Sequence, residues 1–301
     1  LVLWSTFGLA AAQPFLLNAW TKVSANWFAI EERATAVGIV TLGNLIGTAL
    51  GMVLTPILIE STSIATIQLI YGGIAAFSAV VFLIFARETP PTPPCPPGME
   101  VRALMLDGLK HAFTIRAFWF GLLVSFIGLG IFNGTTTWIE NIVRPRGFTP
   151  TDAGTLGALM IVGGVIGAVV MPALSDKQRK RQLFLYIAFI GAIPGLIGLT
   201  FATTSTLLFG SAFVMGFFLI SALPIAMQYA SEVTQPTPEG TSNGLIQLFG
   251  QGAVVFVYIM EAMKSADGSF TRSLLLAVGL LVISIFFVSQ MKDPQQLVQN
   301  K

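Results

Sequence analysis

Three side-chain amides, Gln13, Asn44 and Gln251, are the residues of this 301-residue chain best suited to bind a solute. Each lies inside a long apolar stretch, about 12 to 15 Å from its entry surface if the stretch is a helix that rises 1.5 Å per residue. An amide both donates and accepts hydrogen bonds without carrying charge. Polar groups at such depth in a membrane mark a pathway or a binding site, so we expect these three to hydrogen-bond a substrate.

An alternative interpretation assigns each amide to packing. Gln13 would then fill the hydrogen-bond gap that Pro14 leaves in its helix, and the other two would bond across a helix pair. The common depth of the three amides, on both sides of a proline-rich linker, favours substrate binding, because transporters bind substrates near the midplane between two halves.

A second polar face, nearer the outer surface, contains Asn133 and Trp138 together with two threonines and a glutamate. We expect Asn133 and Trp138 to line an external vestibule of the same substrate site. Trp138 equally suits the membrane interface or a packing role, because its ring is amphipathic.

The composition is that of an all-α integral membrane protein. Hydrophobic residues make up 54% of the chain and charged residues 10%, with a mean hydropathy of +0.80, whereas soluble domains carry charge on about a quarter of their residues. The apolar residues come in runs of about 20 or more, enough to cross about 30 Å of hydrocarbon as helices. The nine predicted transmembrane helices are residues 3–25, 35–59, 64–86, 117–141, 153–174, 183–202, 204–230, 243–263 and 270–290.

A proline-rich stretch divides these spans. Six of the 16 prolines lie between Pro90 and Pro97, and proline lacks the amide hydrogen and the free φ that a helix interior needs. We therefore predict four parts. They are a partial N-terminal bundle of three helices (1–86), a cytoplasmic proline-rich linker (87–116) with an amphipathic helix at 99–113, a six-helix C-terminal bundle (117–290) and a cytoplasmic tail (291–301).

The distribution of Lys and Arg predicts the orientation. Of these 16 residues, 12 fall in one set of alternate loops, which includes the linker and the C-terminus, and 4 in the other set. Positively charged loops stay in the cytoplasm, so we expect a multi-pass cell-membrane protein with a cytoplasmic C-terminus. Leu1 would then lie outside and flush with a span, and we expect the chain to be truncated at its start.

The sequence offers little support for other functions. Cys95 is the only cysteine and His111 the only histidine, so neither a thiolate metal site nor a redox pair can be built. Gly240-Thr-Ser-Asn-Gly244 matches the nucleophile pattern of hydrolases but opens a membrane helix instead of following a strand. We expect no enzymatic activity, cofactor, metal or nucleic-acid partner, and a monomer whose partners are a small-molecule substrate and the lipid bilayer.

Glycines recur at helical spacing in two predicted spans. Gly43, Gly47 and Gly51 lie in the second, and a group that runs from Gly163 to Gly167 lies in the fifth. Small residues on one stripe let two helix backbones approach closely. We expect packing contacts, and the sharper alternative is a contact that slides between helices that move.

The loop Ser175-Asp176-Lys177-Gln178-Arg179-Lys180-Arg181 resembles the Asp-(Arg/Lys)-x-Gly-Arg-(Arg/Lys) loop motif of the major facilitator superfamily. Arg179 stands where the motif has Gly, and Pro172 replaces its leading Gly. Members of that superfamily have twelve helices in two six-helix halves joined by a cytoplasmic loop. The resemblance implies major-facilitator-type helix bundles in which nine of twelve helices, the fourth to the twelfth, are present.

Two stretches are similar to the feline leukaemia virus subgroup C receptor family, the heme, choline and ethanolamine transporter branch of that superfamily. They are Ala12-Gln13-Pro14-Phe15 to Trp27-Phe28 followed by Gly43-Asn44-x-x-Gly47, and Ser231-Glu232-Val233-Thr234 with Pro238-Glu239-Gly240-Thr241-Ser242-x-Gly244, reaching Gln251. The similarity implies that Gln13, Asn44 and Gln251 are ligand-facing amides, and Asn133 stands where the family uses an aromatic residue.

These features favour a secondary active or facilitative transporter that moves a small organic solute, such as a choline-like or other organic cation, by alternating access. No Asp, Glu, Lys or Arg lies at the centre of a predicted span, which argues against proton coupling through this portion. One alternative is a proton-coupled exporter or organic-anion carrier of the same superfamily, whose coupling carboxylate lies upstream. Another is a membrane receptor or scaffold that does not transport.

Overall fold

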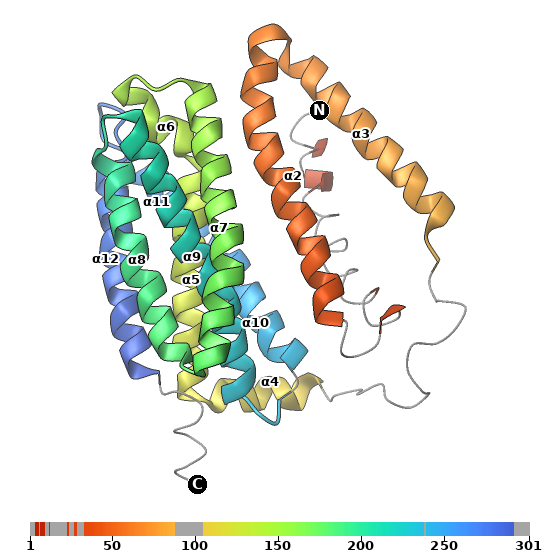
Figure 1. The fold of residues 1–301 in the computed structure, drawn as a ribbon, viewed down its shortest axis with the longest axis vertical. Helices are drawn as coiled ribbons and strands as arrows, with labels where there is room; N and C mark the ends of the chain where they lie inside the picture. The colour runs from red at the N-terminus through yellow and green to blue at the C-terminus, as the bar shows by residue number, and fades with distance from the viewer. Residues whose placement is uncertain are drawn as a thin grey trace. The chain divides into compact units, whose positions relative to one another are not determined.

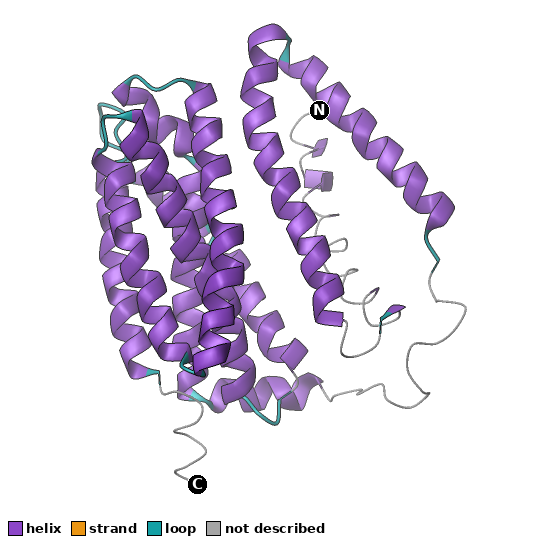
Figure 2. Ribbon diagram, in the orientation of Figure 1, coloured by secondary structure: helices purple, strands orange, loops and turns teal. Residues whose placement is uncertain are grey.

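The computed structural model describes residues 33–87, 105–237 and 239–291, together with positions 4, 5, 7–9, 12, 23, 27 and 28. The regular elements of this described part are all helices (Figures 1 and 2). They are α2 (Arg33–Ser61), α3 (Ile64–Phe85), α4 (Met105–Thr114), α5 (Arg116–Thr137), α6 (Ile139–Val143), the 3-10 helix η1 (Arg144–Arg146), α7 (Pro150–Gln178), α8 (Arg181–Phe201), α9 (Ser205–Val233), α10 (Glu239–Gly252), α11 (Val255–Ala262) and α12 (Thr271–Gln290).

Eight segments of the described part are long and apolar enough to cross a membrane, and they match eight of the nine predicted spans. The first predicted span, 3–25, lies largely outside the described residues, as do Gln13, Cys95 and most of the predicted linker. The all-α membrane fold expected from the composition is therefore confirmed.

The chain divides into two compact units. The smaller contains residues 1–47 and 58–102, and the larger contains residues 48–57 and 103–301. In the smaller unit, α3 begins at a Ser63 cap, whose hydroxyl accepts a hydrogen bond from Thr66 N at 3.2 Å. Its outward side chains, such as Leu69, Phe77 and Leu83, are exposed and apolar, as lipid-facing positions require.

The larger unit is a helix bundle centred on α9, which contacts α5, α7, α8 and α10. Leu208, Met215 and Tyr229 of α9 are fully buried. Helices in lipid gain nothing from the hydrophobic effect when they meet, so their association depends on close packing. The bundle achieves that packing with glycine.

Glycines bring the backbones of α7 and α9 into direct contact. A Cβ atom added to Gly163 or Gly167 would lie closer than 3.0 Å to the carbonyl oxygens of Phe213 or Phe217, and one added to Gly216 would meet the carbonyl of Met160. These three glycines thus pack two helices of one unit, which is the packing role expected for the group from Gly163 to Gly167.

The amphipathic helix predicted at 99–113 is described from Met105, as α4, and its apolar face packs against protein. Ala112 is fully buried in a cluster with Phe118 of α5 and Ile246 of α10. The ring of His111 is half-buried and hydrogen-bonds through Nδ1 to Thr237 Oγ1 at 2.9 Å. The helix therefore packs as part of the larger unit.

Candidate substrate site

Gln251 lies at a break in the middle of its membrane span. The sequence predicts one helix over 243–263, but the span consists of two helices, α10 ending at Gly252 and α11 beginning at Val255 (Figure 1). Around the break, hydrogen bonds join residues three apart: Ala253 N donates to Gly250 O at 3.1 Å, and Val254 N donates to Gln251 O at 3.3 Å. A tightened turn in mid-helix often marks a functional hinge.

The Gln251 side chain is exposed and makes no hydrogen bond to any other residue that the structure describes. An amide without a partner at mid-span is costly in hydrocarbon and is tolerated where it faces a water-filled path or a ligand. Gln251 is thus a polar side chain at mid-span that forms no hydrogen bond within the described part of the chain, and its role as a ligand of the solute stays a prediction.

Two glycines explain why the span breaks here. Gly250 and Gly252 flank Gln251, and glycine is the poorest helix former after proline. A Cβ atom on Gly250 would lie closer than 3.0 Å to Leu129 of α5. The break thus packs closely against α5. The rings of Phe126 and Phe256 also meet there edge to face, with their centroids 5.5 Å apart.

Asn133 and Trp138 lie on or at the end of α5, the helix that backs the break. Asn133 is half-buried, on the helical face that also carries Phe126 and Leu129, and no described residue hydrogen-bonds to its side chain. Trp138 is half-buried, donates its indole N–H to Val257 O at 2.9 Å, and stacks on Phe270 with ring centroids 5.4 Å apart. The larger unit thus brings Gln251, Asn133 and Trp138 onto helices that pack together.

Asn44 and Gln13 belong to the part of the chain before the linker. Asn44 lies on α2 in the smaller unit with its side chain exposed, and Gln13 lies outside the described residues. The convergence of these two amides on Gln251 stays a prediction.

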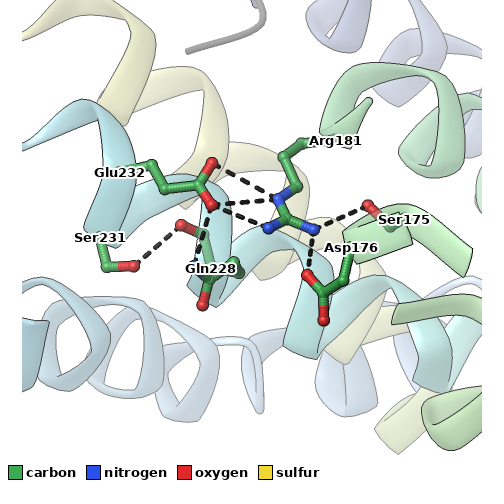
Figure 3. A network of polar contacts seen from close by, with 6 residues as sticks. All are labelled: Ser175, Asp176, Arg181, Gln228, Ser231 and Glu232. Atoms are coloured by element: carbon green, nitrogen blue, oxygen red, sulfur yellow. Dashed lines mark hydrogen bonds and ion pairs between the residues drawn. The ribbon is translucent and has the colours of Figure 1, made fainter. Parts of the chain in front are cut away.

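A second polar centre, at the ends of α7 and α9 and the start of α8, surrounds Arg181 (Figure 3). Arg181 is 8% exposed. Its guanidinium donates to Glu232 Oε1 from Nη2 at 2.8 Å and to Ser175 Oγ from Nη1 at 3.2 Å, and it pairs with Asp176. Gln228 Nε2 donates to the same Glu232 oxygen at 2.9 Å. The cluster ties together the end of α7, the start of α8 and the end of α9.

The sequence singled out the loop from Ser175 to Arg181 but not Glu232 as the partner of Arg181. The two residues are 51 apart in the chain, so no local pattern joins them. Arg179, which stands where the loop motif has Gly, caps α7 in the left-handed conformation with φ 52° and ψ 34°. Glycine adopts that conformation without steric cost. The left-handed backbone at this position therefore explains why the loop motif has Gly there.

Removing the Arg181 guanidinium should destabilise the larger unit. In Arg181→Met, the carboxylates of Glu232 and Asp176 would face each other without a counter-ion, and both are partly solvated, so we expect a loss of about 2 kcal/mol. Thermal unfolding of the detergent-solubilised protein measures it. Lys177→Met, the same change at an exposed position of the same loop, serves as the control. Equal melting temperatures for the two variants would contradict the prediction.

At the opposite end of α8, Arg146 closes the C-terminus of the helix. Its Nη1 donates to the carbonyl oxygen of Ala202, the C-terminal cap of α8, at 2.8 Å, and its Nη2 donates to Ile142 O at 3.3 Å. Partial burial lowers the pKa of this guanidinium from its usual value. A positive charge at a helix C-terminus is favourable, so Arg146 holds α8 against the loop that follows α6.

A model of the Major Facilitator Superfamily matches residues 1–258. The chain is 36% identical over 231 residues to an uncharacterised protein of Archaeoglobus fulgidus, covering 75% of this chain and 99% of that one. It is 30% identical over 270 residues to solute carrier family 49 member A3 of Danio rerio, covering 86% of this chain and 56% of the relative.

A third similarity extends over nearly the whole chain. It is to a choline/ethanolamine transporter of Danio rerio, 25% identical over 319 residues, covering 98% of this chain and 65% of the relative. The chain therefore spans about three-fifths of the length of these two fish proteins.

Proposed function

Because this chain belongs to the major facilitator superfamily, we propose that it acts in secondary active or facilitative transport of a small organic solute by alternating access. The observation that carries the proposal is the break at Gln251, which offers an amide without a described partner in the middle of a membrane span. Broken helices at the midplane are where transporters of several folds bind substrates.

In this proposal Gln251 hydrogen-bonds the solute from the C-terminal bundle, while Gln13 and Asn44 do so from the N-terminal one. Asn133 and Trp138 line the path from the outer side. The support within the larger unit is that α5, which carries Asn133 and ends at Trp138, packs against both halves of the broken span. The three amides share one chemistry, so the solute must present both hydrogen-bond donors and acceptors or recruit water to supply them.

For the solute, we propose a choline-like or other small organic cation. Support comes from similarity to proteins named as choline/ethanolamine transporters in Danio rerio and Homo sapiens. The site residues are uncharged, and no carboxylate lies at the centre of a predicted span. Facilitated diffusion fits this better than proton coupling within residues 1–301.

The proposal includes the organisation of the chain. The parts are the partial bundle 1–86, the linker 87–116, the bundle 117–290 and the tail 291–301, in a monomer in the cell membrane with a cytoplasmic C-terminus. It assigns the protein no catalytic role, in keeping with a family of transporters.

Uptake by the complete protein tests the function. The protein in proteoliposomes would be offered labelled choline, ethanolamine and several organic anions, with and without a proton gradient. Saturable uptake of the cations, unchanged by the gradient, is expected. Uptake of anions, or uptake that follows the gradient, would favour the exporter or anion-carrier alternative, and no saturable flux of any solute would favour a receptor or scaffold.

A further inference from the structure

A chain of hydrogen bonds connects Gln251 to the outer end of α5. The indole N–H of Trp138 donates to Val257 O at 2.9 Å, across 119 residues of sequence. Val257 N donates to Val254 O at 3.0 Å, and Val254 N donates to Gln251 O at 3.3 Å. The two backbone bonds close successive turns between Gln251 and Val257, and the indole of Trp138, from another helix, bonds the carbonyl at the end of the second turn.

The Trp138 ring packs against a buried aromatic ring. It stacks on Phe270, which is 2% exposed, with an angle of 30° between the rings. The ammonium group of Lys264 lies 5.6 Å from the centre of the same Phe270 ring. The backbone N–H of Trp138 donates to Gly134 O as the cap of α5. Both the ring and the backbone of Trp138 therefore have partners within the larger unit.

The outer half-helix, α11, packs against α5 on both sides of the hydrogen bond from Trp138 to Val257. Phe256 and Met260, the residues of α11 on either side of Val257 that point inward, are buried. Phe256 packs against Gly130 and Met260 packs against Gly134, so closely that a Cβ atom on either glycine would lie less than 3.0 Å from the facing side chain. α11 is thus held against α5 through two glycine-lined contacts and one directed hydrogen bond.

We propose that Trp138 is a positioning residue for the Gln251 amide. By fixing Val257, it sets where the outer half of the broken span begins and so how the turn at Gln251 presents its side chain. This inference rests on the proposed role of Gln251 as a ligand of the solute. It adds that the vestibule residue Trp138 acts on the site through the backbone of α11.

The test replaces Trp138 with phenylalanine, which keeps a ring for Phe270 and removes the N–H donor. The matched control is Trp119→Phe. Trp119 lies on the same helix and also donates its indole N–H to a backbone carbonyl, that of Phe113 at 2.9 Å, but at the cytoplasmic end. Both variants of the complete protein would be measured by hydrogen–deuterium exchange over residues 253–258 and by uptake against solute concentration.

For Trp138→Phe we expect amide exchange over residues 253–258 to become at least five-fold faster. We also expect the half-saturation concentration to rise about five-fold, as the loss of one hydrogen bond implies, with a maximal rate within two-fold of the original. Trp119→Phe should leave the exchange rate, the half-saturation concentration and the maximal rate unchanged.

Unchanged exchange over residues 253–258 in Trp138→Phe would overturn the inference. Faster exchange with an unchanged half-saturation concentration would overturn it too, since Trp138 would then hold α11 without serving the site. Failure of the unmodified protein to take up any solute is a different result, which refutes the proposed function itself.

Discussion

Replacing Gln251 with alanine is expected to reduce solute uptake at low concentration by about 10- to 100-fold, while the yield of folded protein stays the same. The side chain is exposed and bonds to no described residue, so its removal leaves no partner in the larger unit unsatisfied. The loss of one hydrogen bond to the solute, which contributes about 1.5–3 kcal/mol when one partner is charged, accounts for that range. Initial rates of labelled uptake at several solute concentrations in proteoliposomes measure it.

Two further variants make the result specific. Gln290→Ala removes the same amide from an exposed position at the end of α12 and should transport normally. Gln251→Asn keeps the amide on a shorter side chain and should fall between alanine and the unmodified protein. Normal uptake by Gln251→Ala would refute the assignment of Gln251 to the site.

Replacing Gly216 with leucine is expected to prevent the larger unit from folding. A Cβ atom at Gly216 would lie closer than 3.0 Å to three backbone atoms of Met160, and backbone cannot rotate aside as a flexible side chain can. The two helices would have to separate along their whole contact, and losses above about 4–5 kcal/mol approach the total stability of a typical domain. Size-exclusion chromatography of detergent extracts should show aggregate in place of a monodisperse peak.

The matched control for this change is Gly279→Leu. Gly279 lies in α12, and a Cβ atom there would meet no described atom within 4 Å. Leucine also raises helix propensity relative to glycine, so this variant should be recovered at the original yield or better. A monodisperse Gly216→Leu protein would show that α7 and α9 do not depend on backbone contact.

The sequence was sufficient to locate the membrane-spanning helices but not the break within one of them or the residues at which helices end. Runs of apolar residues located eight spans, because the thickness of a bilayer sets their length. The break at Gly250 to Val254 escaped prediction, since one amide does not end an apolar run of this length and glycine in a membrane helix also serves packing. The ends of α5 and α9 differ from the predicted 141 and 230, at Thr137 and Val233, for the same reason.

For the candidate site, depth along a helix identified Gln251, but only tertiary contacts revealed its surroundings. The hydrogen bond from Trp138 to Val257 and the ion pair of Arg181 with Glu232 join residues 119 and 51 positions apart. No periodicity in one sequence encodes such pairs. Amphipathicity did find α4, yet it could not tell a lipid surface from a protein surface, because both accept an apolar face.

The backbone contact of α7 with α9 has a consequence for anyone who wishes to follow this protein through its cycle. At Gly163, Gly167 and Gly216 the two backbones meet without side chains between them that could compress or change rotamer. Probes attached to the exposed faces of these two helices should report one separation whatever the solute or its concentration. The distance between probes on α7 and α9 can therefore serve as an internal reference for displacements of other helices.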